Sequence, residues 1–547
     1  MSSSALPSRT RAGLFASLAS TVILAWGWPR RLIALAAGAV GALAMPPFGF
    51  FPALIVSLTV AVWLLDGSAA GDARARLRAA FFVGWQWGFG YFLAGLWWLG
   101  AAFLVDAQRY AWALPLGVVA LPAGLAVFTG VGFALARFLW PQGPLRVLAL
   151  AFGLSVGEWL RAVLFTGFPW NELGLSLAEP LALAQFASVV GLHGLTLIAI
   201  AVAAAPATLA DEPGPGRWAP TLIAALAIAG LAVFGYLRLA EPNPPVDASV
   251  KLRLLQTNLN QGPDFAPDKG AEILGRYLAL SDRATTPERS GVADVTLLVW
   301  PESAFPFLLA REAGALARIS EFLRGGATLA TGAASAEIGA SKVPRRFFNS
   351  ILLLDRSGLR PERYDKRHLV PFGEYIPFES LLRRTGLTEF VHFPGGFSPG
   401  SGSDVLSIPG APDALAMICY EAIFPSEWGG ARSGEAARAK WILNVTDDAW
   451  FGATPGPYQH FELAKLRSIE WGLPMARSAN GGFSAIVDAR GRVVASGPLG
   501  AETVIDGVLP GAIDPPLAAR WGSGLFALGL LAILAVLGLA RALRPRA

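Results

Sequence analysis

Three short segments place a chemically useful side chain where a buried strand is expected to end. Residues 297–303 run from an apolar stretch into the carboxylate of Glu302, and residues 417–421 lead in the same way to the thiol of Cys419. Residues 364–375 carry Lys366 in a charged stretch that continues into an apolar loop with Gly and Pro. Ligand sites of α/β sheets lie outside the carboxyl ends of strands. A carboxylate, an amine and a thiol gathered there would supply a base, an oxyanion stabiliser and a nucleophile.

Each of these residues also has an ordinary structural interpretation. Cys419 is the only cysteine of the chain, and a single buried cysteine is most often inert packing. Glu302 could cap a helix that begins at Ser303, and Lys366 could be a solvated loop residue. Their joint occurrence favours the catalytic interpretation. A lone cysteine also excludes an intrachain disulfide and a thiolate-rich metal site, and we expect neither a metal nor another cofactor.

The elements that must position these side chains lie in a segment of ordinary globular composition, residues 241–516. It opens with a Pro-rich linker at residues 241–245. Short apolar runs bounded by Gly, Pro or Asn predict buried strands, and longer stretches between them predict helices. The strands are expected at residues 251–256, 295–300, 327–331, 350–355, 415–419, 441–445 and 483–488, and the helices at residues 271–283, 308–323 and 459–471. Strands that alternate with helices indicate a layered α/β domain.

The rest of the chain has the composition of a membrane protein. Of 547 residues, 54% are hydrophobic and 15% are charged, whereas soluble proteins carry about 25% charged residues. This composition excludes a wholly soluble protein, and the 33 Phe and 18 Trp residues exclude a disordered one. The net charge of +5 comes from arginines beside apolar runs. Such arginines indicate membrane topology and not a nucleic-acid partner.

Uncharged or nearly uncharged runs of about 20 residues predict spanning helices. Residues 32–65 should form two helices, because the Pro-rich residues 46–52 interrupt them. Further spans are expected at residues 79–105, 111–136, 147–165, 181–210 and 218–237, which makes seven in the membrane domain at residues 31–240. An eighth, at residues 521–540, lies in the C-terminal segment 517–547 with its basic tail. Residues 1–30 are an N-terminal extension, whose apolar residues 12–29 could be an extra span, an interfacial helix or a leader.

The arginines predict the orientation of these helices, because cytoplasmic loops are enriched in Lys and Arg. They all fall on one side of the expected spans, at positions 30, 31, 74, 76, 78, 137, 146, 541, 544 and 546. The domain at residues 241–516 is therefore expected on the extracytoplasmic side.

Six separated segments resemble one protein family. They are residues 166–170 (Thr-Gly-Phe-Pro-Trp), 300–302 (Trp-Pro-Glu), 366–375 (Lys-Arg-His-Leu-Val-Pro-Phe-Gly-Glu-Tyr), 418–421 (Ile-Cys-Tyr-Glu), 444–452 (Asn-Val-Thr-Asp-Asp-Ala-Trp-Phe-Gly) and 456–460 (Gly-Pro-Tyr-Gln-His). The contexts of Glu302, Lys366 and Cys419 resemble the catalytic triad of the carbon-nitrogen hydrolase (nitrilase) superfamily. The whole set resembles its membrane branch, the apolipoprotein N-acyltransferases, from Arg31 to about Ala540. The resemblance implies a multi-pass α-helical membrane domain and an extracytoplasmic nitrilase-like αββα sandwich.

The resemblance also implies an activity. An acyl chain would pass from a phospholipid, with phosphatidylethanolamine as the expected donor, through a Cys419 thioester to the α-amino group of the S-diacylglyceryl cysteine of an apolipoprotein. Glu302 would act as the base and Lys366 would hold the oxyanion, while the supporting residues would be Glu374, Tyr420, Glu421, Phe265 and Trp450. Phe265 stands where the family often has Trp. The expected protein is a monomer of the bacterial inner membrane whose catalytic domain faces the periplasm.

Two other classes remain open from the residues alone. A membrane-tethered amidase would use the same three residues with water as the acceptor. A transporter would place charges near the bilayer midplane, where Glu158 and Arg161 form the visible pair, three residues apart on one helix face. The aromatic loop at residues 166–173 could belong to a lipid entrance or to an interfacial aromatic belt.

Overall fold

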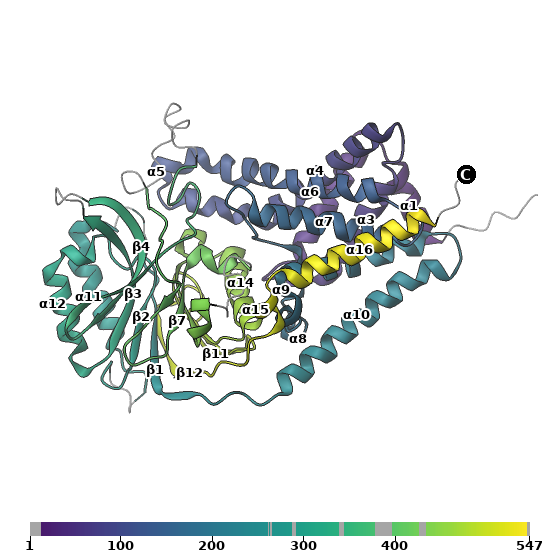
Figure 1. Ribbon diagram of the computed structural model, residues 1–547. Helices are drawn as coiled ribbons and strands as arrows, with labels where there is room; N and C mark the ends of the chain where they lie inside the picture. The colour runs from purple at the N-terminus through teal and green to yellow at the C-terminus, as the bar shows by residue number, and fades with distance from the viewer. Residues whose placement is uncertain are drawn as a thin grey trace, which may run out of the picture.

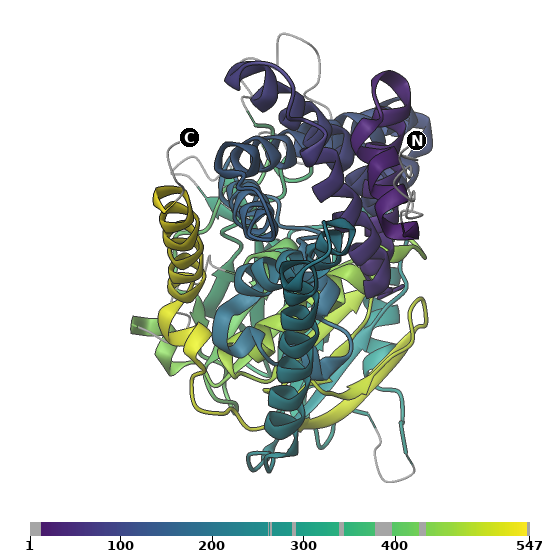
Figure 2. The same ribbon diagram turned by 90° about the vertical axis from the view of Figure 1, so that its right-hand side faces the viewer.

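The computed structural model describes residues 13–260, 262, 265–286, 291–338, 344–377, 396–425 and 434–543. A helical bundle lies beside a two-sheet α/β domain, and α1 and the C-terminal end of α16 lie at the bundle end far from the sheets (Figure 1). The view turned by 90° shows α16 in yellow and the purple N-terminal helices at opposite edges of the bundle (Figure 2). The basic tail with Arg544 and Arg546 lies outside the described residues.

The helices of the bundle follow the apolar runs of the sequence. The predicted break near the Pro-rich residues 46–52 is confirmed, because one helix ends at Gly41 and the next begins at Phe51. The α-helices are α1 (Leu14–Leu24), α2 (Gly27–Gly41), α3 (Phe51–Asp66), α4 (Ala73–Leu96), α5 (Ala107–Tyr110), α6 (Leu121–Leu139), α7 (Arg146–Val163), α8 (Leu181–Ala184), α9 (Ala187–Ala204), α10 (Pro215–Ala240) and α16 (Gly524–Ala542). Short irregular helices η1 (Ala42–Ala44), η2 (Trp97–Leu104), η3 (Ala111–Ala113), η4 (Leu116–Ala120), η5 (Leu173–Leu177) and η6 (Ala205–Ala210) join or extend them.

Five helical segments among the described residues are long and apolar enough to cross a membrane. They are Ala73–Leu104, Ala107–Leu139, Ala187–Ala210, Pro215–Ala240 and Gly524–Ala542, and each coincides with a predicted span. Of the other three predicted spans, α2 and α3 have only 15 and 16 residues, and α7 contains three charged residues. The count of eight spans therefore stays a prediction. The 11-residue helix α1 covers about 16 Å, so alone it is too short to cross a hydrocarbon core of about 30 Å.

Close backbone contacts hold the centre of the bundle together. A Cβ atom added at Gly38 of α2 would lie 1.8 Å from the carbonyl oxygen of Trp87 in α4, and one added at Gly90 would lie 2.1 Å from the carbonyl oxygen of Leu35. Small residues at such contacts are typical of membrane helices, whose association depends on close packing. A side chain at either position would force α2 and α4 apart.

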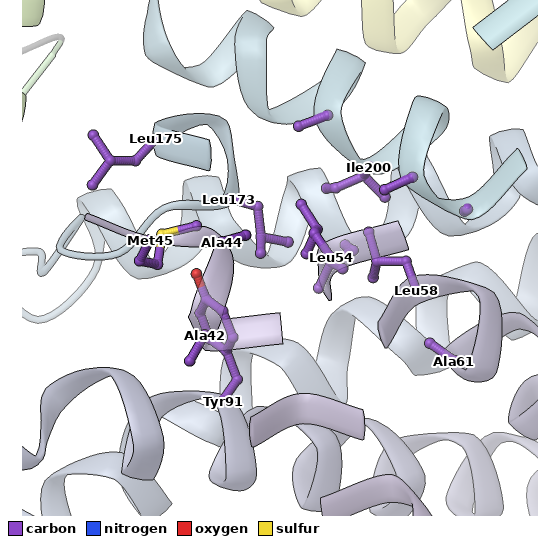
Figure 3. Packing of buried hydrophobic residues seen from close by; sticks show 14 of the residues in the cluster. Ala42, Ala44, Met45, Leu54, Leu58, Ala61, Tyr91, Leu173, Leu175 and Ile200 are labelled. Carbon is purple, nitrogen blue, oxygen red and sulfur yellow. The ribbon is translucent and has the colours of Figure 1, made fainter. Parts of the chain in front are cut away.

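A second buried contact joins α3, α9 and the segment before α8. Leu54 and Leu58 of α3 lie beside Ile200 of α9, and Leu173 and Leu175 of η5 extend the same cluster (Figure 3). This packing draws the loop that follows α7 into the interior of the bundle.

The α/β domain contains two six-stranded sheets. Sheet A has the order β12-β1-β2-β3-β4-β5, and its strands are β1 (Asp247–Gln256), β2 (Leu297–Trp300), β3 (Thr328–Ile338), β4 (Pro344–Asp355), β5 (Gly358–Asp365) and β12 (Thr503–Leu509). Sheet B has the order β11-β10-β9-β8-β7-β6, and its strands are β6 (Val405–Leu406), β7 (Ala414–Ile418), β8 (Trp441–Asp447), β9 (Met475–Asn480), β10 (Ala485–Val487) and β11 (Val493–Ser496). The neighbours β1, β2 and β3, and likewise β7, β8 and β9, pair in parallel. Both parallel trios therefore direct their carboxyl ends to a common edge of their own sheet.

Alternating side chains of the strands build four layers. Leu254 and Val299 face the core between the sheets, whereas Leu298 and Trp300 face helices α11 (Gly270–Ser281) and α12 (Ala313–Phe322) on the outside of sheet A. Helix α14 (Pro455–Trp471) covers the outer face of sheet B. The predicted αββα sandwich is confirmed.

Helix α14 is shared between the two parts of the molecule. Leu463, Leu466 and Ile469 belong to the buried cluster of the bundle, while Phe461 and Ala464 pack into the core beneath sheet B. In Figure 1, α14 lies between the sheets and the helices of the bundle. The helix is thus buried on both sides, and its packing fixes the position of the α/β domain relative to the bundle.

The seven predicted strands all occur, but five strands of the two sheets were not predicted: β5, β6, β9, β11 and β12. The clearest case is β9, which is buried along its whole length although it contains Arg477, Ser478 and Asn480. Each of these polar side chains has buried hydrogen-bond partners. A search for apolar runs misses such a strand, because its burial depends on tertiary partners.

We expect Gly38→Ala to lower the midpoint of thermal unfolding in detergent, because overpacking of this kind costs about 1–3 kcal/mol. The matched control is Gly124→Ala in α6, where an added Cβ meets no atom within 4 Å. Equal midpoints for the two variants, measured by differential scanning fluorimetry, would contradict the packing described for α2 and α4.

Candidate active site

Glu302 lies in the turn directly after β2, inside the molecule. Its Oε1 accepts a hydrogen bond of 2.7 Å from Asn349 Nδ2, and its Oε2 accepts one of 2.8 Å from the backbone N–H of Asp447. A Cβ added at Gly332 of β3 would lie only 2.4 Å from the Glu302 Cα. The carboxylate is therefore positioned by both sheets and does not cap a helix, since residues 302 and 303 form a turn.

Lys366 follows the last residue of β5 and is 1% exposed. Its Nζ lies 3.5 Å from Glu302 Oε1 and 3.0 Å from Glu374 Oε1. The same Asn349 amide that binds Glu302 also donates to Glu374 Oε1 at 2.7 Å. The lysine backbone is held as well, because its N–H donates to the Asn349 carbonyl oxygen. One ammonium thus bridges two carboxylates in a site that is nearly closed to water.

Cys419 follows β7 and is half-buried. Its φ of 49° lies in the left-handed region, where a residue with a side chain is strained. A sharp strand-to-helix turn that carries the nucleophile is a known device for presenting it to a substrate. Here the turn leads into the 3₁₀ helix η12 (Cys419–Ile423).

Burial and the nearby Glu302 carboxylate keep the Cys419 thiol protonated. Burial raises the pKa of Cys419 well above its usual value, the negative charge of Glu302 raises it further, and Lys366 opposes both effects. Burial also raises the pKa of Glu302, although Lys366 partly offsets this. Burial alone would lower the pKa of Lys366, but the carboxylates of Glu374 and Glu302 raise it. The site therefore contains a neutral thiol beside a carboxylate whose basicity is increased and an ammonium that stays charged.

Glu374 and Glu421 support the catalytic loops. Glu374 Oε2 accepts from the backbone N–H of Val370, which ties the loop after Lys366 to the lysine itself. Glu421 accepts hydrogen bonds from the backbone N–H groups of residues 418, 367 and 368 and from the Tyr364 hydroxyl. Burial raises the pKa of Glu421 to about 7 in spite of these donors. Glu421 therefore links the cysteine turn to the lysine loop.

Tyr420 turns away from the triad toward the bundle. Its hydroxyl donates to the carbonyl oxygen of Gly167 at 2.9 Å. In the same loop Trp170 is 2% exposed, whereas Phe165, directly before the loop, is 81% exposed. The second half of this aromatic loop is therefore a buried contact with the catalytic domain, and only its beginning has the exposure expected of an interfacial belt.

The ion pair predicted on α7 is confirmed, with 2.6 Å between Arg161 Nη2 and Glu158 Oε2. Arg161 also donates to the carbonyl oxygens of Phe168 and Trp170. Its hydrogen bonds thus shape the aromatic loop, which accounts for a buried pair at this position without a transport pathway.

Phe265 packs in the α/β domain, and Trp450 lies near the contact with the bundle. Phe265 packs against the outer core of sheet A together with residues of α11. Trp450 is half-buried in η14 (Ala449–Phe451), next to Phe451, whose ring contacts Trp98 and Trp170. Phe265 therefore has a packing role in this conformation.

Within the described residues, one group of side chains has the spacing of a metal site: Cys419, Asp448 and His460, whose ligand atoms lie within 4.8 Å of one another. The His460 ring nitrogens already face the Asp448 carboxylate and the Cys419 carbonyl oxygen. Arg477 also donates to Asp448 at 2.8 Å. A guanidinium thus already supplies positive charge where a metal would lie, so these residues do not fit a metal site.

Comparison with known proteins agrees with this geometry. Residues 37–205 match the apolipoprotein N-acyltransferase N-terminal domain, and residues 261–522 match the carbon-nitrogen hydrolase family. The chain is 48% identical to the apolipoprotein N-acyltransferase of Rhodopseudomonas palustris over 542 residues, which cover 98% of this chain and 99% of that protein. It is 47% identical to the protein of the same name from Bradyrhizobium diazoefficiens over 513 residues, with coverages of 92% and 94%. This chain belongs to the apolipoprotein N-acyltransferase family.

Glu302, Lys366 and Cys419 all lie within the residues that match the carbon-nitrogen hydrolase family. Lys366 Nζ lies 3.5 Å from Glu302 Oε1, and the charges of both residues act on Cys419. Asn349 was not predicted, although it donates to both carboxylates of the site. Asn349 lies inside β4, between Phe348 and Ser350, but one residue before the predicted strand at residues 350–355. A search for residues at strand ends overlooks a residue of this kind.

We expect opposite effects on the Cys419 thiol from two substitutions in this apolipoprotein N-acyltransferase family member. Glu302→Gln removes a negative charge and should shift the pH midpoint of Cys419 alkylation by iodoacetamide downward. Lys366→Met removes a positive charge and should shift it upward. Mass spectrometry of the single cysteine measures both rates. Shifts in the same direction would contradict the electrostatic description.

Proposed function

We propose that this protein transfers an acyl chain from a phospholipid to the α-amino group of the S-diacylglyceryl cysteine of an apolipoprotein. The observation that carries the proposal is the buried contact of Glu302 with Lys366 beside the cysteine turn, at the boundary with a membrane bundle. The relatives that share nearly the whole chain are apolipoprotein N-acyltransferases. The residue roles below are part of the proposal.

In the first half-reaction the Cys419 Sγ attacks the carbonyl carbon of a phospholipid ester. The thiol proton passes to Glu302, and Lys366 stabilises the oxyanion of the tetrahedral intermediate. The intermediate collapses by breaking the C–O bond, and Glu302 returns the proton to the departing lysophospholipid alkoxide. A base is necessary because the pKa of the thiol is raised, and thiolate, not thiol, is the nucleophile.

In the second half-reaction the lipoprotein amine attacks the carbonyl carbon of the thioester. Glu302 takes a proton from the amine, Lys366 again stabilises the oxyanion, and the C–S bond breaks to restore the thiol. Glu374 keeps Lys366 in place between the two steps, since it is the carboxylate nearest to the ammonium. Positioned proton transfer of this kind contributes typically ~100 to 10,000-fold to a rate.

The bundle gives this chemistry access to lipid. Both substrates keep acyl chains in the bilayer, and each CH₂ group moved into water would cost about 0.8 kcal/mol. A catalytic domain docked on the bundle through Tyr420 and α14 avoids this cost, because the acyl chains can stay in the membrane while the ester reaches Cys419.

We also propose that the catalytic domain faces the periplasm. The arginine-bearing helix ends lie together, since Arg30 bonds to residues 64 and 68, and Arg146 pairs with Asp66 at 3.2 Å and with Asp211 at 2.6 Å. The domain lies at the opposite end of the bundle (Figure 1). The enrichment of arginine in cytoplasmic loops assigns this shared end to the cytoplasm.

Incubation with acyl-labelled phosphatidylethanolamine should leave one labelled acyl group on Cys419 when no acceptor is present. A diacylated lipopeptide should then discharge it. Cys419→Ala should form no adduct, and Cys419→Ser should form none either, because a carboxylate base does not generate an alkoxide. Release of free fatty acid without acceptor would indicate a hydrolase, and absence of any adduct on the wild-type protein would contradict the proposal.

We expect Glu302→Gln and Lys366→Ala each to slow formation of this adduct, the lysine variant by ~100 to 1,000-fold, which is the typical effect of losing one oxyanion donor. Matched controls are Glu337→Gln and Lys440→Ala, at exposed positions of the same domain. These controls should keep the wild-type rate. A near wild-type rate for either active-site variant would show that its assigned role is wrong.

Cysteine labelling tests the orientation. In a Cys419→Ala background, Arg324→Cys, at a position whose side chain is 74% exposed, should react with a membrane-impermeant thiol reagent in intact spheroplasts. Ala70→Cys, exposed between α3 and α4, should react only after the membrane is permeabilised. The reverse labelling pattern would show that the membrane domain has the opposite orientation and that the proposal is wrong.

A further inference from the structure

A histidine of α14, His460, forms a hydrogen bond with the backbone carbonyl oxygen of Cys419. His460 Nε2 lies 3.0 Å from the Cys419 carbonyl oxygen, and His460 Nδ1 lies 2.7 Å from Asp448 Oδ1. The Cys419 carbonyl oxygen can only accept, so His460 Nε2 donates to it. Arg477 Nη2, which donates to Asp448, lies 3.3 Å from His460 Nδ1.

This hydrogen bond acts on the strained residue of the site. A residue with a side chain remains at a φ of 49° only when its surroundings hold it there. The peptide that follows Cys419 is planar, so fixing its carbonyl oxygen fixes the orientation of the whole peptide group. His460 is itself completely buried and cannot move independently, since Asp448 is anchored by Thr446 at 2.9 Å and by Arg477 at 2.8 Å.

The residue before His460 binds the membrane bundle. Gln459 Oε1 accepts from the indole N–H of Trp98 at 3.1 Å and of Trp170 at 3.0 Å. Its Nε2 donates to the carbonyl oxygens of Pro46 at 3.1 Å and Gly95 at 3.4 Å. These four contacts use the full hydrogen-bonding capacity of a glutamine side chain. They come from the α2–α3 turn, the end of α4 with η2, and the loop after α7.

We propose that His460 is a positioning residue for the Cys419 nucleophile, and that Gln459 couples this position to the membrane bundle. Two consecutive residues of α14 thus connect three membrane segments to the backbone of the reactive cysteine. The inference rests on the proposed acyl transfer and adds to it a residue that acts through Cys419 without touching substrate. It predicts that docking of the bundle affects the rate of the chemical step and not only lipid binding.

The experiment is a single turnover of the purified full-length protein with acyl-labelled phosphatidylethanolamine and no acceptor. The burst amplitude counts the correctly folded active sites, and the burst rate constant reports how well each site reacts. A purely structural role of His460 would lower the amplitude alone. A positioning role lowers the rate constant at nearly full amplitude and leaves the phospholipid concentration for half-maximal rate unchanged.

His460→Phe keeps a ring next to Trp170 and Phe451, which contact His460 in the wild-type protein, but it removes the hydrogen bond to the Cys419 carbonyl oxygen. We expect its burst rate constant to fall ~10 to 100-fold, the size expected when a buried acceptor loses its donor. Gln459→Met keeps a side chain of similar length and removes all four polar contacts. We expect its rate constant to fall several-fold.

The matched control is Glu470→Gln near the opposite end of α14. Glu470 also docks α14 on the bundle, by accepting from the backbone N–H of Leu192 at 2.7 Å, and it pairs with Arg467. This variant should lower the thermal midpoint and keep the wild-type burst rate constant.

The outcomes separate this inference from the proposed function. If the wild-type protein forms no acyl adduct, the proposed function fails. If the wild-type protein forms it and His460→Phe reacts at the wild-type rate constant, or loses amplitude only, the inference alone fails. If His460→Phe has no amplitude at all, Gln459→Met decides by the same two criteria. A control that slows as much as Gln459→Met also overturns the coupling.

Discussion

The candidate active site depends on one electrostatic constraint, which is that the ammonium of Lys366 is removed almost entirely from water. A buried charge is stable only when it is paired and hydrogen-bonded. Glu302 and Glu374 supply the countercharges, and Asn349 donates to both, which reduces the repulsion between two carboxylates that lie beside one ammonium. Burial raises the pKa of the Cys419 thiol, and the negative charge of Glu302 raises it further, while Lys366 lowers it. The carboxylate that pairs with the lysine therefore also helps to keep the thiol protonated.

This constraint explains why two sheets are required. Glu302 and Asn349 come from sheet A, while Cys419 and the backbone N–H of Asp447 come from sheet B. The contact between the sheets is the core that contains Leu254 and Val299, so the catalytic distances follow from the packing of that core. A shift of one sheet against the other would separate the base from its donor at residue 447.

The membrane bundle takes part in the same framework. The loop after α7 is shaped by Arg161, and it meets Tyr420 and Gln459 from the catalytic domain. Because α14 is buried on both sides, the bundle and the sheets are packed as one body through this helix. The charged pair of α7, which by sequence alone was compatible with a transporter, has a structural purpose in this arrangement.

The sequence by itself determined the apolar runs, the break at the Pro-rich turn and most of the core strands, and it singled out Glu302, Lys366 and Cys419 as candidate site residues. These features are local. The composition of an apolar run is enough to predict its burial, and a polar residue at the end of such a run can be read directly from the sequence. The tertiary structure alone decided what depends on partners distant in sequence. It placed β9 in the core despite its polar residues, assigned Asn349 to two carboxylates, turned Tyr420 toward the membrane loop and packed Phe265 against the outer core of sheet A. The physical reason is that a buried polar group is stable only beside a partner of matching geometry, and nothing in a single segment specifies where that partner lies.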